Sequence, residues 1–401
     1  MTRLALTVDA GDPASWAPAV AAYVAHSRER DGFELVLTEV ESAIPTPVLG
    51  QMVEEVCRHA SGGGSFGAIS LGHPDGSADA VTVTTPAEVR ERLGVSEPDV
   101  PTNAGEIVEV ARTGKWLLDR LVATRDRHIF ERTYVRLEGV PKVSVRIPTW
   151  RKPELLVCRA IASALNGRYP DIEVVVCSDG PDPEARRMVE AVQDPRVVYR
   201  EVPERPNYAS HSTHFWMTAG SHAANGALDA CTGDVIAPLD HDDAFTETHI
   251  NELLTALDTS GADAVWGQAL CESRNGSWAV WGSAPLRKGY ISHGSVLYTR
   301  ALAHFRFDPH CWLIEEPGDW NMWRRMADAG ATFVHLPQVV LVHFKELTSI
   351  EDDPSLTEAQ LATHDLRATT DQLATDVLGT DARMYLDVSQ RDPAAVRASA
   401  A

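Results

Sequence analysis

Between residues 141 and 345 the chain alternates apolar runs with amphipathic segments, and this rhythm limits the possible folds more than any other feature. Five of the apolar runs predict strands, namely KVSVRIP, IEVVVCS, RVVYREV, DVIAPLD and ADAVWGQALCE. Strands that are apolar throughout and alternate with helices predict an α/β fold, in which a mostly parallel sheet is covered by helices on both faces. Ligands of such sheets bind beyond the carboxyl ends of the strands.

The rest of the chain predicts two further parts. At 401 residues the length suits roughly two to three domains. Residues 1–140 predict an N-terminal α/β region of unknown role, with strands at LALTV, FELVLTEV and FGAISLG. Residues 346–401 predict an acidic, helical C-terminal extension. The segment 141–345 is therefore expected to form a domain of its own.

The charge balance is acidic, with 57 Asp and Glu against 36 Lys and Arg and a formal net charge of −21. A field of that sign repels nucleic acid and anionic membranes, although a bound metal still permits a phosphorylated substrate. Six cysteines without a CxxC pair predict reduced thiols rather than a disulfide framework or a zinc site. Because the sequence shows neither a signal-peptide pattern nor an apolar run long enough for a membrane span, we expect a cytoplasmic protein.

The densest group of candidate site residues is LDHDDAF, where an apolar run leads directly into Asp240, Asp242 and Asp243. Along an extended chain, Asp240 and Asp242 would lie on one side, roughly 6.5 Å apart. Three carboxylates at a strand end repel one another unless a cation lies among them, and oxygen ligands of this kind suit Mg²⁺ or Mn²⁺. The alternative is a helix N-cap, which would account for a single Asp.

Two earlier strands also end in polar residues. RIPTWRKP places Pro148, Thr149 and Arg151 after the first strand, and VVVCSDG places Asp179 after the second. A carboxylate at such a position can accept hydrogen bonds from a nucleobase or a ribose. The alternative for SDGPDP is a turn followed by the start of a helix.

Taken in order, these elements resemble the family 2 glycosyltransferases, whose nucleotide-sugar-binding fold is called GT-A. The resemblance rests on strand–IPTW, strand–SDG, a helix containing Asn225, and strand–LDHDD, and it covers residues 142–345. It implies a divalent metal, Mg²⁺ or Mn²⁺, and a nucleoside-diphosphate sugar as donor, with UDP as the nucleotide. The sequence leaves the sugar open, with N-acetylglucosamine and glucose as candidates.

The resemblance also implies roles for individual residues. Asp179 would contact the base, Asp240 the ribose, and Asp242 the metal that bridges the diphosphate. A histidine late in the domain often completes the metal shell, and His343 occupies such a position. The donor-binding set implied in this way comprises Pro148, Thr149, Arg151, Asp179, Asn225, Asp240, His293 and Gly294.

The segment EEPGDWNMWRRM is similar to the part of the family pattern that carries the catalytic base. Asp319 matches that carboxylate. An inverting transfer needs one base to deprotonate the acceptor while a metal stabilises the departing diphosphate. The alternative for Asp319 is helix capping, because Trp320, Trp323 and Met326 form an apolar helix face behind it.

The sequence departs from the family pattern at three positions and leaves other residues undecided. Ser178 stands in place of an Asp, Ala224 in place of an Arg, and Gly318 in place of an acidic residue. His211, His214 and His222 are either loop residues or ligand contacts. The aromatic residues Trp266, Trp278, Trp281 and Tyr290 either stack an acceptor ring or pack in the core.

The sequence therefore favours a metal-dependent, inverting glycosyltransferase that acts on a small-molecule, carrier-bound or glycan acceptor. One alternative is a sugar-1-phosphate nucleotidyltransferase, but IPTWRKP lacks the Gly-rich loop that such an enzyme needs after its first strand. A second alternative is a non-catalytic binding or scaffold protein with the same fold. Homo-oligomerisation stays open.

Overall fold

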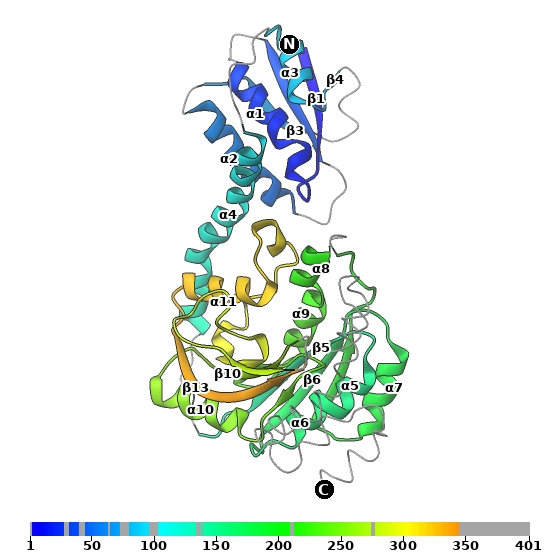
Figure 1. Cartoon of the computed structure of the whole chain (residues 1–401), viewed down its shortest axis with the longest axis vertical. Helices are drawn as coiled ribbons and strands as arrows, with labels where there is room; N and C mark the ends of the chain where they lie inside the picture. Colours follow the sequence, from blue (N-terminus) through cyan, green and yellow to red (C-terminus); the bar gives the residue numbers. More distant parts are fainter. Residues whose placement is uncertain are drawn as a thin grey trace. The chain divides into compact units, whose positions relative to one another are not determined.

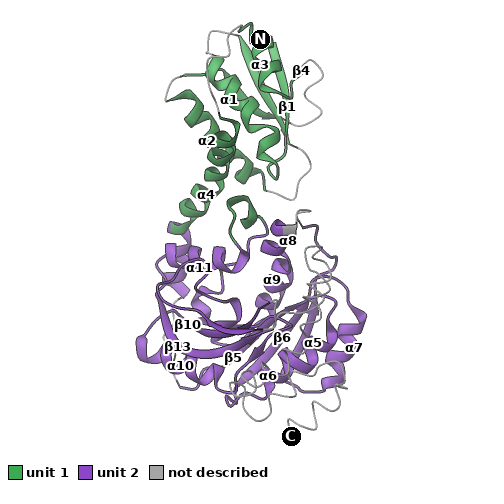
Figure 2. Cartoon of the chain, in the orientation of Figure 1, with its two compact units in different colours: residues 1–123, 310–316 green, residues 124–309, 317–401 purple. Residues whose placement is uncertain are grey.

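The computed structural model describes residues 2–27, 32–39, 45–62, 65–72, 80–95, 103–133, 137, 139–208, 212–273 and 277–344. The helical extension expected over 346–401 lies outside these residues. The chain divides into two compact units, one made of residues 1–123 and 310–316 and the other of residues 124–309 and 317–401 (Figure 2). In the described part, no helix is long and apolar enough to cross a membrane.

The first unit is built on a four-stranded sheet with the order β3-β2-β1-β4, in which every pairing is parallel. Helix α3 begins with a capping box, in which Thr85 and Glu88 each accept from the backbone of the other. The α/β alternation expected near the N-terminus is therefore present. The elements are β1 (Thr2–Val8), η1 (Pro13–Ser15), α1 (Ala17–His26), β2 (Phe33–Glu39), α2 (Thr46–Ser61), β3 (Ala68–Gly72), β4 (Val81–Thr82), α3 (Pro86–Leu93) and η6 (Cys311–Ile314), together with the first part of α4 (Ala104–Thr133).

The second unit contains a nine-stranded sheet (Figure 1). Eight strands follow the order β7-β6-β5-β8-β12-β10-β13-β9, and β11 pairs with β10. After the end of α4 the elements are β5 (Val143–Thr149), α5 (Pro153–Leu155), η3 (Leu156–Ile161), α6 (Ala162–Leu165), β6 (Ile172–Ser178), α7 (Pro183–Val192), β7 (Val197–Glu201), α8 (Ser212–Thr218), α9 (Ser221–Ala230), β8 (Val235–Pro238), β9 (Ala244–Phe245), α10 (His249–Ser260), β10 (Ala264–Glu272), β11 (Trp278–Trp281), η4 (His293–Ser295), β12 (Val296–Thr299), η5 (Arg300–Leu302), α11 (Gly318–Asp328) and β13 (Phe333–His343).

The strand directions confirm the α/β class and refine it. Strands β7, β6, β5 and β8 are parallel to one another, as the sequence predicts. The other half of the sheet is mixed, because β12 runs antiparallel to both β8 and β10 while β13 is parallel to β10. The parallel half carries the three strand ends with the candidate site residues, and their carboxyl ends meet at one edge.

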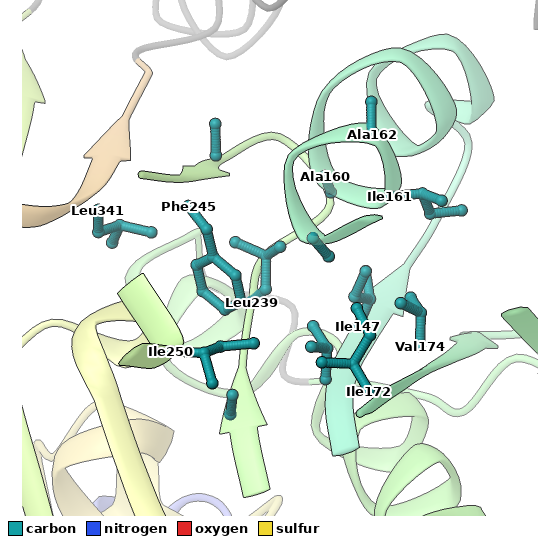
Figure 3. Packing of buried hydrophobic residues seen from close by; sticks show 14 of the residues in the cluster. Ile147, Ala160, Ile161, Ala162, Ile172, Val174, Leu239, Phe245, Ile250 and Leu341 are labelled. Atoms are coloured by element: carbon teal, nitrogen blue, oxygen red, sulfur yellow. The ribbon is translucent and has the colours of Figure 1, made fainter. Parts of the chain in front are cut away.

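The two faces of β5 differ in chemistry. Val143, Val145 and Ile147 belong to an apolar cluster with residues of the α5–η3–α6 segment and α10. Figure 3 shows Ile147 in this cluster. Alternation along the strand places Ser144 and Arg146 on the opposite face, where both are completely buried. Buried polar groups need hydrogen-bond partners, so these two side chains determine what packs against this face.

The helix expected to contain Asn225 is α9, and it is separated from the helix before it by a short break. Helix α8 ends at Thr218 and α9 begins at Ser221. Gly220 between them has a φ of +78°, a left-handed conformation that glycine adopts at little cost. Helix α9 then packs against β5 and β6.

At the amino ends of the parallel strands, Glu173 links three segments of the second unit. Its carboxylate accepts from Ser144 Oγ (2.5 Å), Lys142 Nζ (2.7 Å) and Thr232 Oγ1 (2.8 Å). Burial alone would raise the pKa of Glu173, but these hydrogen bonds outweigh it and lower the pKa to about 2.

Glu173→Gln tests this link. The folded-state pKa is depressed, so the ionised carboxylate contributes stability above the pKa of the unfolded chain, and this is lost as pH falls toward about 2. We expect the variant to lose about 1–3 kcal/mol at pH 7. Urea titrations between pH 7 and acid should show that wild type and variant converge as pH falls. Glu184→Gln, at an exposed ion pair with Arg187, is the control and should leave stability nearly unchanged. A constant difference between wild type and Glu173→Gln at all pH values would contradict the assignment.

Candidate functional site

The structure brings the three predicted strand ends together. Thr149 at the end of β5 pairs with Ser178 at the end of β6, and the Asp179 N–H donates to the Thr149 carbonyl at 2.9 Å. The Leu239 N–H donates to the Arg146 carbonyl at 2.9 Å, which places the residues after β8 beside the end of β5. Asp179 and Asp240 therefore emerge at the same edge of the sheet.

Two side chains, His293 and Arg146, hold Asp240 through consecutive hydrogen bonds. Its Oδ1 lies 2.9 Å from His293 Nδ1, and His293 Nε2 lies 3.0 Å from Arg146 Nη2. Desolvation would raise the pKa of Asp240, but the adjacent His293 outweighs it and holds the pKa well below its usual range. Asp240 is therefore a carboxylate at neutral pH.

The expected extended arrangement of Asp240 and Asp242 is wrong. Strand β8 ends at Pro238, and the Asp243 N–H donates to the Asp240 carbonyl at 3.2 Å, so residues 240–243 form a turn. Side-chain alternation holds only for extended chain. The Arg159 guanidinium donates to the Asp242 carbonyl at 2.7 Å and thereby fixes the turn.

The turn gives its last two acidic side chains different surroundings. Asp242 is half-buried, and its Oδ2 lies 3.8 Å from Lys152 Nζ and 3.9 Å from His241 Nε2. Asp243 is buried and contacts His343 Nδ1 at 2.9 and 3.0 Å. The charge of Asp243 raises the pKa of His343. Asp242 thus faces the site, whereas Asp243 supports His343.

A divalent cation fits these residues when a substrate supplies further ligands. Among the described residues, no three His, Cys, Asp or Glu side chains are arranged to hold a metal ion by themselves. His343 contacts Asp243 through Nδ1, which leaves Nε2 as the ring nitrogen available to a metal. A carboxylate behind a histidine is a common support for a metal ligand. Mg²⁺ usually takes one or two carboxylates together with substrate phosphates. Asp242 and His343, the two residues predicted to bind a metal, therefore have suitable chemistry for that role.

Asp319 lies in the first turn of α11, and its Oδ1 accepts from the Trp320 N–H at 2.7 Å. Desolvation raises the pKa of Asp319. The charge of Asp240 also acts on Asp319, so the carboxylates that were expected to bind donor and acceptor occupy one region. A raised pKa suits a carboxylate that must accept a proton.

Asp179 is covered by residues that sequence reasoning missed. The Tyr208 hydroxyl donates to Asp179 Oδ1 at 2.6 Å, and Arg205 Nε lies 3.9 Å from Oδ2. The Arg205 guanidinium lies over the Trp150 ring at 4.5 Å. Burial raises the pKa of Asp179, and the Tyr208 hydroxyl opposes that effect. The sequence signal for this cover was the run PERPNY, in which Arg and Tyr follow the third strand closely.

Phe307, which sequence reasoning also missed, connects several site residues. The Asn225 amide donates to the Phe307 carbonyl at 2.9 Å and accepts from its N–H at 2.8 Å. The Phe307 ring lies 4.8 Å from the Arg146 guanidinium and 5.6 Å from the His293 ring. Asn225, expected in the donor site, thus holds Phe307 in this structure.

The other residues expected to bind the nucleotide-sugar donor differ in how deeply they are buried and in what they contact. Thr149 is buried, Pro148 half-buried, and Arg151 exposed with its guanidinium 4.9 Å over the Trp150 ring. Gly294 packs closely, because a Cβ there would lie 3.0 Å from Leu341 Cδ1. Their contacts with a donor stay predictions.

The undecided histidines and aromatic residues are dispersed. His211 lies outside the described residues, and His222 packs edge-on against Tyr208 at 5.8 Å. The peptide carbonyl of His214, rather than its ring, accepts from Thr218. Trp266 packs against Phe333 and His335, Trp278 against Phe344, Tyr290 lies under Arg287, and Trp281 is 38% exposed. The four expected aromatic residues therefore have separate surroundings.

Part of the second unit is similar to a known family of proteins. Residues 144–319 match the model of the glycosyl transferase family 2. The chain is 25% identical to chondroitin synthase of Escherichia coli over 227 residues, which cover 51% of this chain and 29% of that protein. It is 28% identical to the succinoglycan biosynthesis protein ExoM of Rhizobium meliloti over 161 residues, which cover 37% of this chain and 49% of that protein. The chain thus spans less than half the length of either relative.

Solved structures similar to this chain include TarS of S. aureus. Residues 1–349 of TarS in complex with UDP-GlcNAc align with a TM-score of 0.40 and 14% identity, over 60% of this chain and 72% of that chain. The complex of the same TarS fragment with UDP aligns with a TM-score of 0.39 and 15% identity.

Gly318 stands where the family pattern has an acidic residue, and close packing explains why a glycine lies there. The variant Gly318→Ala tests this explanation. A Cβ at residue 318 would lie 3.0 Å from the Met217 carbonyl and 3.1 Å from the Phe307 ring. We expect the variant to lose about 1–3 kcal/mol of stability, although alanine favours helix, because the added methyl group is overpacked. Gly50→Ala in α2, where a Cβ would meet nothing within 4 Å, is the control and should stabilise its helix. Equal or higher unfolding temperature for Gly318→Ala would show that the contact does not explain the glycine.

Proposed function

Because residues 144–319 match the model of the glycosyl transferase family 2, we propose that the chain is a metal-dependent, inverting glycosyltransferase with a nucleoside-diphosphate sugar as donor. The observation that carries the proposal is the convergence of Asp240, Asp242 and Asp319 at one edge of the sheet, with His293 and His343 beside them. Transfer of a sugar needs both a site for an anionic leaving group and a base, and this edge has candidates for each. The family match favours this activity over a nucleotidyltransferase or a scaffold.

In the proposed donor complex, UDP is the nucleotide. Asp179 accepts from the base and Asp240 from the ribose. The diphosphate lies toward Asp242, where the ammonium group of Lys152 adds a positive charge within 3.8 Å of that carboxylate. Asp242 and His343 would hold a divalent cation, Mg²⁺ or Mn²⁺, which would supply charge neutralisation for the departing diphosphate.

The proposed base is Asp319. A hydroxyl or amine of the acceptor attacks the anomeric carbon, the bond from that carbon to the diphosphate oxygen breaks, and Asp319 receives the acceptor proton. Attack opposite the leaving group inverts the anomeric configuration. The desolvated setting that raises the pKa of Asp319 strengthens it as a proton acceptor.

The acceptor is proposed to be a small molecule, a carrier-bound intermediate or a glycan. Residues 141–345 would perform the transfer, and the N-terminal α/β region has an unknown role. Cytoplasmic location and possible homo-oligomerisation stay predictions from the sequence.

Asp242→Asn tests the metal. The amide keeps the size of the side chain but removes its charge, so we expect Mn²⁺-dependent UDP binding to weaken at least about ten-fold. Isothermal calorimetry with UDP, with and without Mn²⁺, measures the effect. Asp258→Asn, at an exposed position on α10, is the control and should bind like wild type. Metal-independent UDP binding of equal strength in wild type and Asp242→Asn would rule out the metal role of Asp242.

Asp319→Asn tests the base. We expect transfer to fall by about 10²–10⁴-fold while UDP binding changes little, because the amide cannot accept the proton. The readout combines turnover of a UDP-sugar panel with UDP calorimetry. Asp328→Asn on the same helix, where the carboxylate pairs with Arg324 at 3.0 Å, is the control. Unchanged turnover of Asp319→Asn would reject the assignment.

A further inference from the structure

A completely buried arginine lies behind the proposed donor site. Arg146 is in the middle of β5 and is 0% exposed. Its Nη1 donates to the Ala224 carbonyl at 3.2 Å, its Nη2 lies 3.0 Å from His293 Nε2, and its guanidinium lies 4.8 Å from the Phe307 ring. A buried charge is costly unless its surroundings compensate it, so an arginine retained here needs a reason.

The hydrogen-bond chemistry of Arg146 determines where the proton of His293 lies. A guanidinium can only donate hydrogen bonds. His293 Nε2 must therefore accept from Arg146, which requires Nε2 to be bare. The ring proton is then on Nδ1, from which it is donated to Asp240 Oδ1 at 2.9 Å. The buried guanidinium of Arg146 thus determines which atom donates and which accepts in both hydrogen bonds, from Arg146 to His293 and from His293 to Asp240.

This arrangement limits what His293 can do in the site. Both ring nitrogens are used within the protein, so neither is free to remove a proton or to ligate a cation. The His293 side chain is only 11% exposed, whereas that of Asp240 is 39% exposed. Because Oδ1 of Asp240 is occupied, its Oδ2 is the oxygen left for a ligand. The influence of Arg146 and His293 on a donor therefore passes through Asp240.

The surroundings of Arg146 hold it in this place. The Phe307 ring beside the guanidinium is itself held by two hydrogen bonds from Asn225. The helix pattern that normally carries an arginine has Ala224 in this chain, and Arg146 bonds to the carbonyl of that same residue. Within the described residues, no carboxylate lies within 4.0 Å of the Arg146 guanidinium to neutralise it directly. Asp240, reached through the His293 ring, is the anion at the end of its hydrogen-bond chain.

We propose that Arg146 is a positioning residue of the donor site, which keeps the proton of His293 on Nδ1 and thereby fixes the Asp240 carboxylate in the orientation that binds the donor. The inference rests on the proposed function, since Asp240 is taken as a donor contact. It adds a residue that lies too deep in the sheet to touch the donor.

The first test observes wild-type protein and needs no variant to fold. With ¹⁵N-labelled histidine, long-range proton–nitrogen spectra distinguish a protonated ring nitrogen from a bare one. The His293 signals are identified by their loss in His293→Asn. We expect Nδ1 protonated and Nε2 bare in the ligand-free protein at pH 7.5. A proton on Nε2, or on both nitrogens, would overturn the inference.

The second test is a double-mutant cycle with UDP and Mn²⁺ as the probe. In Arg146→Met we expect UDP affinity to fall about ten-fold, as for the loss of one positioned hydrogen bond. In Arg146→Lys, which retains a charge and a donor, we expect a smaller loss. In the His293→Asn background, Arg146→Met should have almost no further effect, because the route to Asp240 is already broken. Arg300→Lys, where the guanidinium bonds to the Gly233 and Cys231 carbonyls, is the control and should bind UDP like wild type.

The outcomes separate this inference from the proposed function. If wild type fails to bind UDP with Mn²⁺, the proposed function fails, while the spectra still report on His293. If wild type binds and Arg146→Met binds equally well, the positioning role is rejected. Additive losses in Arg146→Met and His293→Asn would also reject it, because they would show that Arg146 acts independently of His293.

Discussion

Carboxylates that share one edge of a sheet repel one another. The arrangement of the second unit therefore depends on the contacts that offset the negative charge of each carboxylate. Five acidic side chains at this edge each make a close contact with a different partner. These partners are Tyr208 and Arg205 for Asp179, His293 for Asp240, Lys152 and His241 for Asp242, His343 for Asp243, and the Trp320 N–H for Asp319. Because the partners are distinct, the carboxylates can lie near one another and still differ in proton affinity.

Some of these partners, such as His293 for Asp240 and His343 for Asp243, come from elements far apart in the sequence, so the charges of the site are linked to the packing of the domain. Arg146 reaches the edge from inside β5, and Phe307 covers it after being fixed by Asn225. Phe307 also occupies the space that a side chain at residue 318 would need. Two of the three departures from the family pattern, Ala224 and Gly318, thus contact this one cluster of Arg146, His293 and Phe307.

Local patterns were sufficient to predict the parallel half of the sheet. Apolar strands with helices between them fixed the places of Asp179 and Asp240, because carboxyl ends of parallel strands meet at one edge. The patterns could not reveal the turn at residues 240–243 or the interruption at Gly220, since both depend on backbone conformations at single residues. They also missed Arg146. An arginine inside an apolar strand was visible in VSVRIP, but its partners lie 78 and 147 residues away.

The central claim is that this edge of the sheet binds a metal and a nucleoside diphosphate together. Anomalous diffraction from crystals grown with Mn²⁺ and UDP tests it most directly, because it locates the metal independently of activity. The account predicts a manganese peak at bonding distance from the Asp242 carboxylate, with diphosphate oxygens completing its shell. Manganese bound away from Asp242, or UDP bound at another face of the domain, would contradict it.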